Sequence, residues 1–222
     1  MLATLIYTLI TDGSPFRSEL FTPWLTATLI DFYVNVVAIA VWVAYNESSW
    51  VNTILWIILL ICFGSITTCV YIVRKLVNVS TRGPEDPVRL ILSRNDGHQK
   101  MTCCSLLMWR VVFSVLAVFM SAVVIYTVAT DGLPFRKELL TPWMAATLID
   151  FYINVLAISV WVAHKESTWV GTVIWICLLI CFGSITTCTY IAIQLFRLSD
   201  GDPMYYILLD HHSKPAVSSS SS

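Results

Sequence analysis

Two aspartates lie inside long apolar runs, where a charged side chain is costly. Asp31 lies in the run from 23 to 45, and Asp150 lies at the matching place in the run from 142 to 164. An acid at the centre of a membrane-spanning helix costs about 2.5–3.5 kcal/mol on insertion scales, so it must face a protein interior that offers polar partners. We expect the pair either to handle a proton, a cation or a polar solute, or to hold neighbouring helices together by hydrogen bonds.

Polar and small residues continue along the helix face that carries each aspartate. Steps of four and three residues place them on one side of a helix. We expect the two faces to meet between the halves of the molecule, with both carboxylates near a shared axis. We call each of these helix faces a stripe. The candidate binding residues on the two stripes are Thr28, Asp31, Asn35, Thr147, Asp150 and Asn154, and the first stripe also contains Trp24, Ala38 and Trp42.

The matched acids belong to a sequence that repeats itself. Residues 12–73 recur 119 positions later, at 131–192, and most of the paired residues are identical. A repeat of this length indicates two copies of one structural unit. The predicted division is a first unit at 1–76, a basic linker at 77–104, a second unit at 105–197 and a polar Ser-rich tail at 198–222.

Composition predicts an all-α membrane protein. The chain is 57% hydrophobic and only 12% charged, against roughly 25% charged residues in soluble domains. Apolar runs of about 20 residues are long enough to span a bilayer core about 30 Å thick. Five such runs occur, at about 23–45, 50–73, 105–129, 142–164 and 169–196.

The same composition narrows the partners and the chemistry. A net charge of −1 provides no basic surface for nucleic acid, so the expected partner is the lipid bilayer. No dinucleotide, Walker or zinc pattern is present, so we expect no cofactor and no metal and assign no catalytic residue. Cys103 and Cys104 precede an apolar run on the basic side and are candidates for lipidation.

Parity predicts how the two units are oriented. Residues 1–11 match only the last third of the helix expected at 105–129, so the first unit lacks most of its first helix. A full unit then has three spans, and an odd number of spans gives two tandem three-helix units in inverted topology. The linker, cytoplasmic by its basic residues, and the tail would lie on opposite sides.

The incomplete first unit also suggests a partner. We expect each unit to pack its second helix against its own first helix. The face of the helix at 23–45 would then be open to a partner helix or to a second copy of the chain. An endomembrane or the plasma membrane is the expected location.

Four motifs together resemble a plant family of integral membrane proteins known only as a domain of unknown function. They are Thr-Asp-Gly-x-Pro-Phe-Arg, Thr-Pro-Trp, Thr-Leu-Ile-Asp-Phe-Tyr-x-Asn and Cys-Phe-Gly-Ser-Ile-Thr-Thr-Cys. The resemblance covers nearly the whole chain and implies a multi-pass protein, but it implies no activity.

Three functions remain open from the sequence. The leading one is a transporter-like or permeation protein whose aspartates handle a proton, a cation or a small polar solute. The alternative is a non-catalytic scaffold or assembly factor. A lipid-modifying enzyme with the two carboxylates as acid and base is the third. Water reaching Asp31 and Asp150 would favour the first, whereas carboxylates sealed by hydrogen bonds would favour the second.

Overall fold

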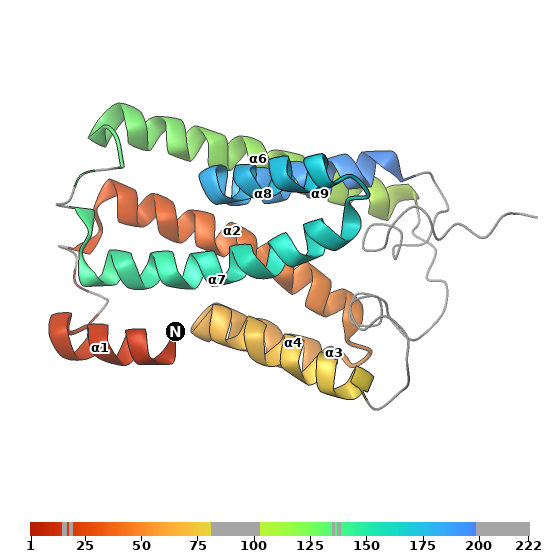
Figure 1. Ribbon diagram of the computed structural model, residues 1–222, viewed down its shortest axis with the longest axis horizontal. Helices are drawn as coiled ribbons and strands as arrows, with labels where there is room; N and C mark the ends of the chain where they lie inside the picture. The colour runs from red at the N-terminus through yellow and green to blue at the C-terminus, as the bar shows by residue number, and fades with distance from the viewer. Residues whose placement is uncertain (15–16, 18–19, 81–102, 135, 137–138, 199–222) are drawn as a thin grey trace, which may run out of the picture.

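The computed structural model describes residues 1–14, 17, 20–80, 103–134, 136 and 139–198. In these residues the only regular structure is helical and there is no strand, which confirms the expected all-α class. Most of the predicted linker and tail lies outside them. The helices are α1 (Leu2–Asp12), α2 (Pro23–Asn46), α3 (Trp50–Phe63), α4 (Ser65–Ser80), α6 (Cys103–Asp131), α7 (Pro142–Lys165), α8 (Trp169–Phe182) and α9 (Ser184–Arg197), shown in Figure 1.

Within the described ranges three helices, α2, α6 and α7, are long and apolar enough to span a membrane. Their positions agree with three of the predicted runs. At the start of α2 the Thr22 hydroxyl accepts a hydrogen bond from the Leu25 backbone N–H at 3.2 Å, and Pro23 takes the first helical position. Thr141 caps α7 in the same way. A hydroxyl cap followed by proline favours a helix start, and it fixes where these two helices begin.

The runs at 50–73 and 169–196, each predicted to be one straight span, are broken helices. The breaks fall at Gly64 and Gly183, and both glycines have a φ of 51°. That left-handed value favours glycine over residues with a side chain. The chain reverses at each break, so we call α3 with α4 hairpin 1 and α8 with α9 hairpin 2.

Contacts between the two arms of each hairpin establish the reversal. In hairpin 1 the Thr67 hydroxyl donates to the Leu59 carbonyl at 2.8 Å, although a straight helix would separate these residues by about 12 Å. The rings of Trp56 and Tyr71 meet edge to face with centroids 5.1 Å apart. Hairpin 2 makes the same two contacts at the positions 119 residues later.

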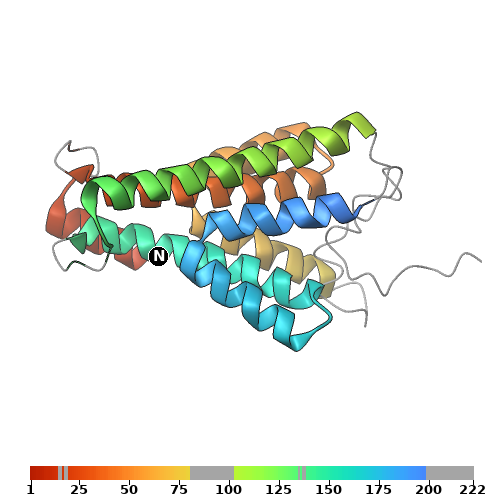
Figure 2. The same cartoon turned by 90° about the horizontal axis from the view of Figure 1, so that it is seen from above.

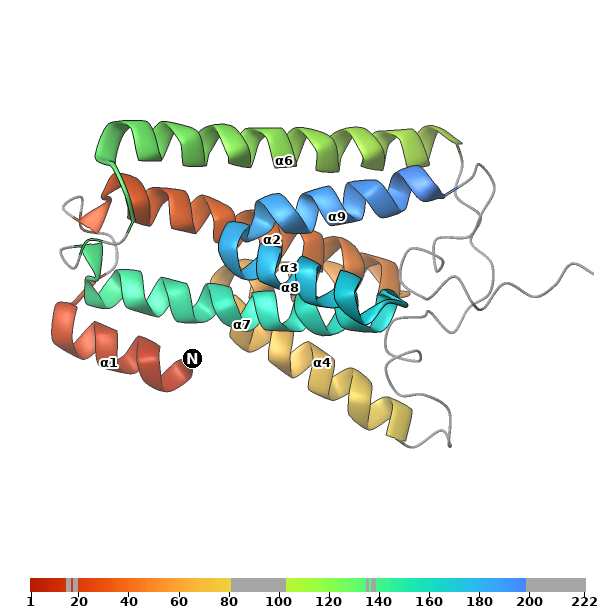
Figure 3. The ribbon, with the colours of Figure 1, turned by 45° about the horizontal axis from the view of Figure 1, so that its top comes forward.

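This reversal removes the basis of the parity argument. Each hairpin returns to the end of the bundle from which it starts, so it adds no net crossing. Figures 1 and 3 show α2 and α7 running in the same direction, with α4 and α9 ending together at the right-hand end of the bundle. The expected inverted arrangement is therefore not confirmed, and neither is the placement of linker and tail at opposite ends.

The first helix of each half packs against the second helix of the other half. α6 packs along α9 and against α2 of the other half, whereas α1 packs against α7, and Figure 2 shows α6 lying across α2. The expectation that each unit packs its second helix on its own first helix is wrong. α2 and α7 meet along a line that we call the α2–α7 seam. Around it the two helices and both hairpins share one core cluster, whose buried side chains are Phe32, Val36, Ile39, Val43, Phe151, Val155, Ile158 and Val162 from α2 and α7, and Leu60, Tyr71, Leu179 and Tyr190 from the hairpins.

The hairpin predicts a cross-link that a straight span forbids. The Lys75 ammonium donates to the Asn46 carbonyl at 3.3 Å, whereas a straight helix would hold these residues more than about 30 Å apart. In a background without other cysteines, Asn46→Cys with Lys75→Cys should be joined by a reagent about 10 Å long, as detected by mass spectrometry. Asn46→Cys with Phe63→Cys at the hairpin tip should stay unlinked. No link in the first pair would contradict the hairpin.

Candidate functional site

Each hairpin tip exposes the start of a helix, and an aspartate from the other half of the chain caps it. The Ser65 backbone N–H, at the start of α4, donates to Asp150 Oδ1 at 2.9 Å. The Ser184 backbone N–H, at the start of α9, donates to Asp31 Oδ1 at 2.8 Å, and the Ser184 hydroxyl donates to the same oxygen. The first N–H groups of a helix have no partner within it, so each carboxylate satisfies a group that the tip leaves open. We call the two contacts the reciprocal brace.

The reciprocal brace is also matched in charge. The start of a helix carries about half a positive elementary charge, and a carboxylate there stabilises the helix by up to about 2 kcal/mol when it is partly buried. Asp31 and Asp150 are both half-buried. Each therefore finds the polar partner expected for an acid in an apolar helix. That partner is the backbone of the opposite hairpin.

The brace leaves no room for a side chain at the hairpin tips. A Cβ added to Gly64 would overlap the carboxylate of Asp150 and would lie 2.7 Å from Phe32 Cζ. Gly183 stands in the same relation to Asp31. Glycine is thus needed at each tip for two reasons, its left-handed backbone and the close approach of the carboxylate.

The remaining candidate residues differ in their surroundings. The Thr28 hydroxyl donates to the Trp24 carbonyl, one turn back in its own helix, at 2.8 Å, and Thr147 makes the matching bond in α7. Both threonines are half-buried, whereas Asn35 and Asn154 are fully buried, with 0% exposure. Accessibility along each stripe therefore falls from the threonine and aspartate to the asparagine.

Asn35 and Asn154 are buried polar residues without hydrogen-bond partners. Neither the amide nitrogen nor the amide oxygen of either residue has one. The indole nitrogens of Trp42 and Trp161, two turns further along the same faces, are also buried and unpartnered. A buried donor or acceptor left unpaired costs about 1–3 kcal/mol, and native proteins contain few of them. We call these four residues the buried polar set.

The two asparagines border the α2–α7 seam. At about 100° per residue, Asn35 lies between Asp31 and Phe32 on the surface of α2. Asp31 contacts the tip of hairpin 2, and Phe32 contacts the tip of hairpin 1. Asn35 therefore faces the region between the two hairpins, where α7 packs on α2. The matched contacts of the second half give Asn154 the equivalent place on α7.

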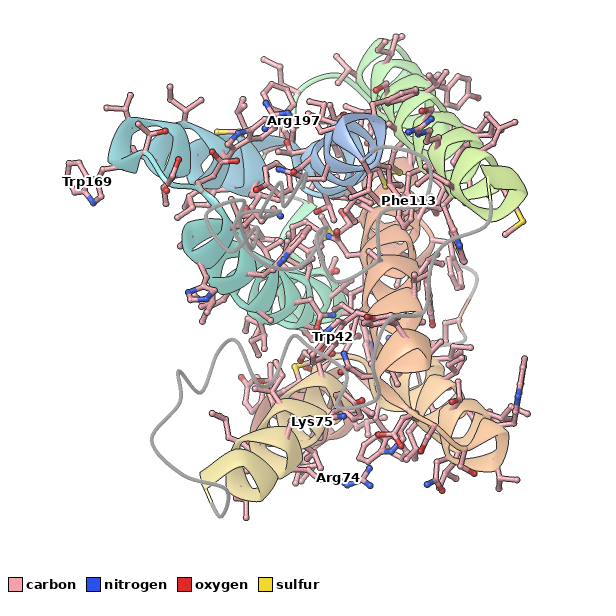
Figure 4. The ribbon with its side chains drawn as sticks, turned by 90° about the vertical axis from the view of Figure 1, so that its right-hand side faces the viewer. Trp42, Arg74, Lys75, Phe113, Trp169 and Arg197 are labelled. Atoms are coloured by element: carbon pink, nitrogen blue, oxygen red, sulfur yellow. The ribbon has the colours of Figure 1, made fainter. Side chains whose placement is uncertain are left out.

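The sequence did not reveal a polar cluster at the open end of each hairpin, the end that Figure 4 views. The Tyr71 hydroxyl donates to Glu47 Oε1 at 3.1 Å, and Arg74 lies 3.6 Å from the same oxygen. In hairpin 2, Tyr190 donates to Glu166 Oε1 at 2.9 Å. A straight span would place Tyr71 more than about 30 Å from Glu47. The glycine midway along each run was the sequence signal that could have predicted the helix break, and with it the contact between these residues.

Within the described ranges, no group of three or more His, Cys, Asp or Glu residues could hold a metal ion. Cys103 and Cys104 are the first residues of α6, but their side chains lie outside the described part of the chain. Their lipidation stays a prediction. The cysteines described as free thiols are Cys62, Cys69, Cys177, Cys181 and Cys188.

The reciprocal brace should contribute measurably to stability. We expect Asp31→Asn to lower the free energy of unfolding by about 1–2 kcal/mol, because the amide keeps an acceptor but loses the attraction to the helix start. Gly183→Ala should cost more, about 3 kcal/mol, because its Cβ collides with that carboxylate. Unfolding of the purified protein in detergent measures both.

Asn52→Ala, at an exposed position of α3, is the control and should change stability by less than about 0.5 kcal/mol. If Asp31→Asn is as stable as this control, the carboxylate does not stabilise the hairpin tip.

Comparison with known proteins identifies a family. No curated protein and no solved structure matches the chain. One family model, described as a protein of unknown function (DUF1475), matches residues 1–215. The matched range includes both hairpins and the reciprocal brace. The chain therefore belongs to the DUF1475 family.

Proposed function

We propose that the chain is a multi-pass integral membrane protein in which α2, α6 and α7 cross the bilayer and both hairpins enter and leave from one side. The apolar length of the three helices supports this. The 14 residues of α3, and equally of α8, extend about 21 Å, less than the roughly 30 Å of the hydrocarbon core. A break in a helix is tolerated inside a bilayer only where its backbone groups are satisfied, and the reciprocal brace satisfies one backbone N–H at each break.

In this arrangement the halves are related by an axis along the bilayer normal, as in one class of transporters built from parallel repeats. The ends of α4 and α9 then lie on one side of the membrane. The basic residues of the linker favour the cytoplasm for that side.

Within this membrane protein we propose a permeation or binding function for a small polar solute at the α2–α7 seam. The observation that carries it is the pair of fully buried, unpartnered amides of Asn35 and Asn154. Lipid offers these groups no hydrogen bond, and each unpaired atom costs about 1–3 kcal/mol. A polar guest between the halves would pair with them and remove that cost.

The chemistry of the buried polar set favours an uncharged guest. Its amides donate and accept hydrogen bonds, its indole N–H groups donate, and neither kind of group carries a charge. Asp31 and Asp150 are engaged by the hairpin tips, so they are less available for a proton or a cation than expected from the sequence. Water, urea and small alcohols fit this donor-rich set.

The fall in accessibility along each stripe supports a route to this site. Thr28 and Asp31 are half-buried, whereas Asn35, one turn later, is fully buried. A solute that enters along the stripe would meet hydroxyl and carboxylate groups first and the buried amides last. The asparagine level is then the constriction between the two halves.

A scaffold is the second candidate, and the reciprocal brace favours it. Both carboxylates cap helix starts, so their presence in apolar helices has a structural explanation without any solute. On this account the asparagines are tolerated packing defects, and the helices between which they lie serve to bind another protein.

Replacing both asparagines should separate the two candidates. Leucine has the same branching and the same number of side-chain heavy atoms as asparagine and needs no hydrogen bond, so Asn35→Leu with Asn154→Leu should leave stability unchanged or raised. In proteoliposomes examined by stopped-flow light scattering, the natural chain should increase the permeability to water, urea or glycerol. The double variant should lose this increase by about tenfold, as expected for one lost hydrogen bond of about 1.4 kcal/mol.

Asn52→Leu, on the exposed face of α3, is the matched control and should behave as the natural chain. If the natural chain admits none of the three solutes, or if the double variant admits them equally well, the solute site is wrong and the scaffold remains.

A further inference from the structure

The open end of hairpin 1 contains two tryptophan rings around a buried tyrosine, beside a carboxylate. The rings of Trp42 and Trp56 meet the Tyr71 ring edge to face, with centroids 5.2 and 5.1 Å from its own. The Tyr71 hydroxyl donates to the carboxylate of Glu47. We call these three rings and this carboxylate box 1. Together they favour a positively charged group, because an aromatic face and a carboxylate both attract a cation.

Two cations of the chain itself lie at box 1. The Arg74 guanidinium lies 5.4 Å from the centroid of the Trp56 ring, and one of its nitrogens lies 3.6 Å from Glu47 Oε1. The Lys75 ammonium lies 5.5 Å from the centroid of the Tyr71 ring. A cation is attracted to an aromatic face within roughly 6 Å of the ring centroid. Box 1 therefore shows which kind of group this arrangement binds.

Hairpin 2 repeats the three rings and the carboxylate, and we call this group box 2. Its members are Trp161, Trp175, Tyr190 and Glu166. The ring centroids of the two tryptophans lie 5.3 and 4.9 Å from that of the tyrosine, again edge to face. Oε1 of the glutamate accepts a hydrogen bond from the tyrosine hydroxyl at 2.9 Å. The geometry that holds a cation in hairpin 1 is thus present in hairpin 2.

The two cations of box 1 are replaced by uncharged residues in hairpin 2. Ile193 stands at the position that matches Arg74, and its side chain is shorter and apolar. Gln194 stands at the position that matches Lys75, and its side-chain amide hydrogen-bonds to Tyr190. The place that the Arg74 guanidinium takes at box 1 therefore has no charged group from the matching position at box 2.

Box 2 also lacks a side chain beside its carboxylate. Gly171 stands where the first half has Asn52. A Cβ added to Gly171 would lie 3.3 Å from Glu166 Oε2, so a side chain at this position would project from the immediate surroundings of the carboxylate. Both differences between the hairpins remove side-chain atoms next to Glu166, and both favour a ligand from outside the chain.

The positive charges near box 2 indicate the kind of ligand. Lys165 directly precedes Glu166, and Arg197, exposed at the end of α9, acts electrostatically on the Tyr190 hydroxyl. These groups would repel a simple cation. A zwitterionic headgroup suits the site better, because its ammonium can face the rings and the carboxylate while its phosphate faces Arg197.

Box 2 also lies at a suitable depth for a lipid headgroup. Figure 4 shows Trp169 and Arg197 at the open end of hairpin 2, and Trp169 is 83% exposed. Exposed tryptophans are typical of the boundary between hydrocarbon and headgroups. In the membrane arrangement proposed above, the open end of the hairpin therefore reaches the headgroup layer.

We propose that box 2 binds the headgroup of a zwitterionic phospholipid, with the ammonium over Trp175 and beside Glu166 and the phosphate towards Arg197. This site rests on the proposed membrane arrangement but not on the solute site at the α2–α7 seam. Box 1 does not bind the lipid, because Arg74 already takes the matching place.

Native mass spectrometry of the whole protein in a non-ionic detergent, titrated with phosphatidylcholine, tests the site. We expect one saturable adduct per chain, and about tenfold weaker binding of phosphatidylglycerol, which has the phosphate but no ammonium. Glu166→Gln keeps an acceptor for Tyr190 but should weaken phosphatidylcholine binding about tenfold. Glu47→Gln is the matched control in box 1 and should leave this binding unchanged.

A second variant fills box 2 instead of removing its charge. Ile193→Arg should place a guanidinium over Trp175, as Arg74 lies over Trp56, and should reduce the phosphatidylcholine adduct by about tenfold or more. Val170→Arg adds the same charge at an exposed position of α8 and should keep the adduct.

Three results would overturn the proposal. If phosphatidylcholine gives no saturable adduct with the natural chain, box 2 does not bind lipid. If phosphatidylglycerol binds as tightly as phosphatidylcholine, the ammonium is not recognised. If the adduct survives in both Glu166→Gln and Ile193→Arg, the lipid binds elsewhere. Solute permeability does not enter these measurements, so this proposal and the solute site fail independently.

Discussion

Two helix starts in the middle of an apolar bundle, and the two carboxylates that cap them, hold this fold together. A helix that begins inside the bundle exposes backbone N–H groups and a partial positive charge. Asp31 and Asp150 supply an acceptor and a negative charge at 2.8 and 2.9 Å from those N–H groups. Since each aspartate belongs to the opposite half, neither hairpin tip is satisfied unless the halves are together. The packing of α1 on α7 and of α6 on α2 acts in the same direction, because each half covers a helix of the other.

The reciprocal brace explains why the acids are present and therefore moves the question of activity to other residues. Among the residues that the structure describes, the buried side-chain groups without a hydrogen-bond partner include all four members of the buried polar set, besides Asn46, Ser65 and Trp143. Asn35 and its counterpart on α7 lie one turn beyond the brace, at the seam between the halves. In the proposed membrane arrangement this puts neutral hydrogen-bonding groups at depth and charged ones nearer the accessible part of each stripe. Such an order suits a neutral solute better than a proton or a cation.

Local signals in the sequence predicted much of the secondary structure. Thr22 and Pro23 mark the start of α2, and the position of Asp31 in an apolar helix required a polar partner within the protein. The break at Gly64 was not predicted, because a glycine in an apolar run is equally typical of close packing between straight helices. Only tertiary contacts, Thr67 with Leu59 and Asp150 with Ser65, distinguish the two. The missed break also affected the predicted topology, because the predicted orientation of the second unit depends on the number of membrane spans counted in the first.

Amide hydrogen exchange at the two hairpin tips tests the reciprocal brace most directly. The Ser184 N–H should exchange about tenfold faster in Asp31→Ala than in the natural chain, for about 1.4 kcal/mol of lost protection, while the Ser65 N–H keeps its rate. Asp150→Ala should give the reverse pattern. Unchanged exchange at Ser184 in Asp31→Ala, or an equal increase at both serines in either variant, would contradict a brace in which each half caps the hairpin of the other.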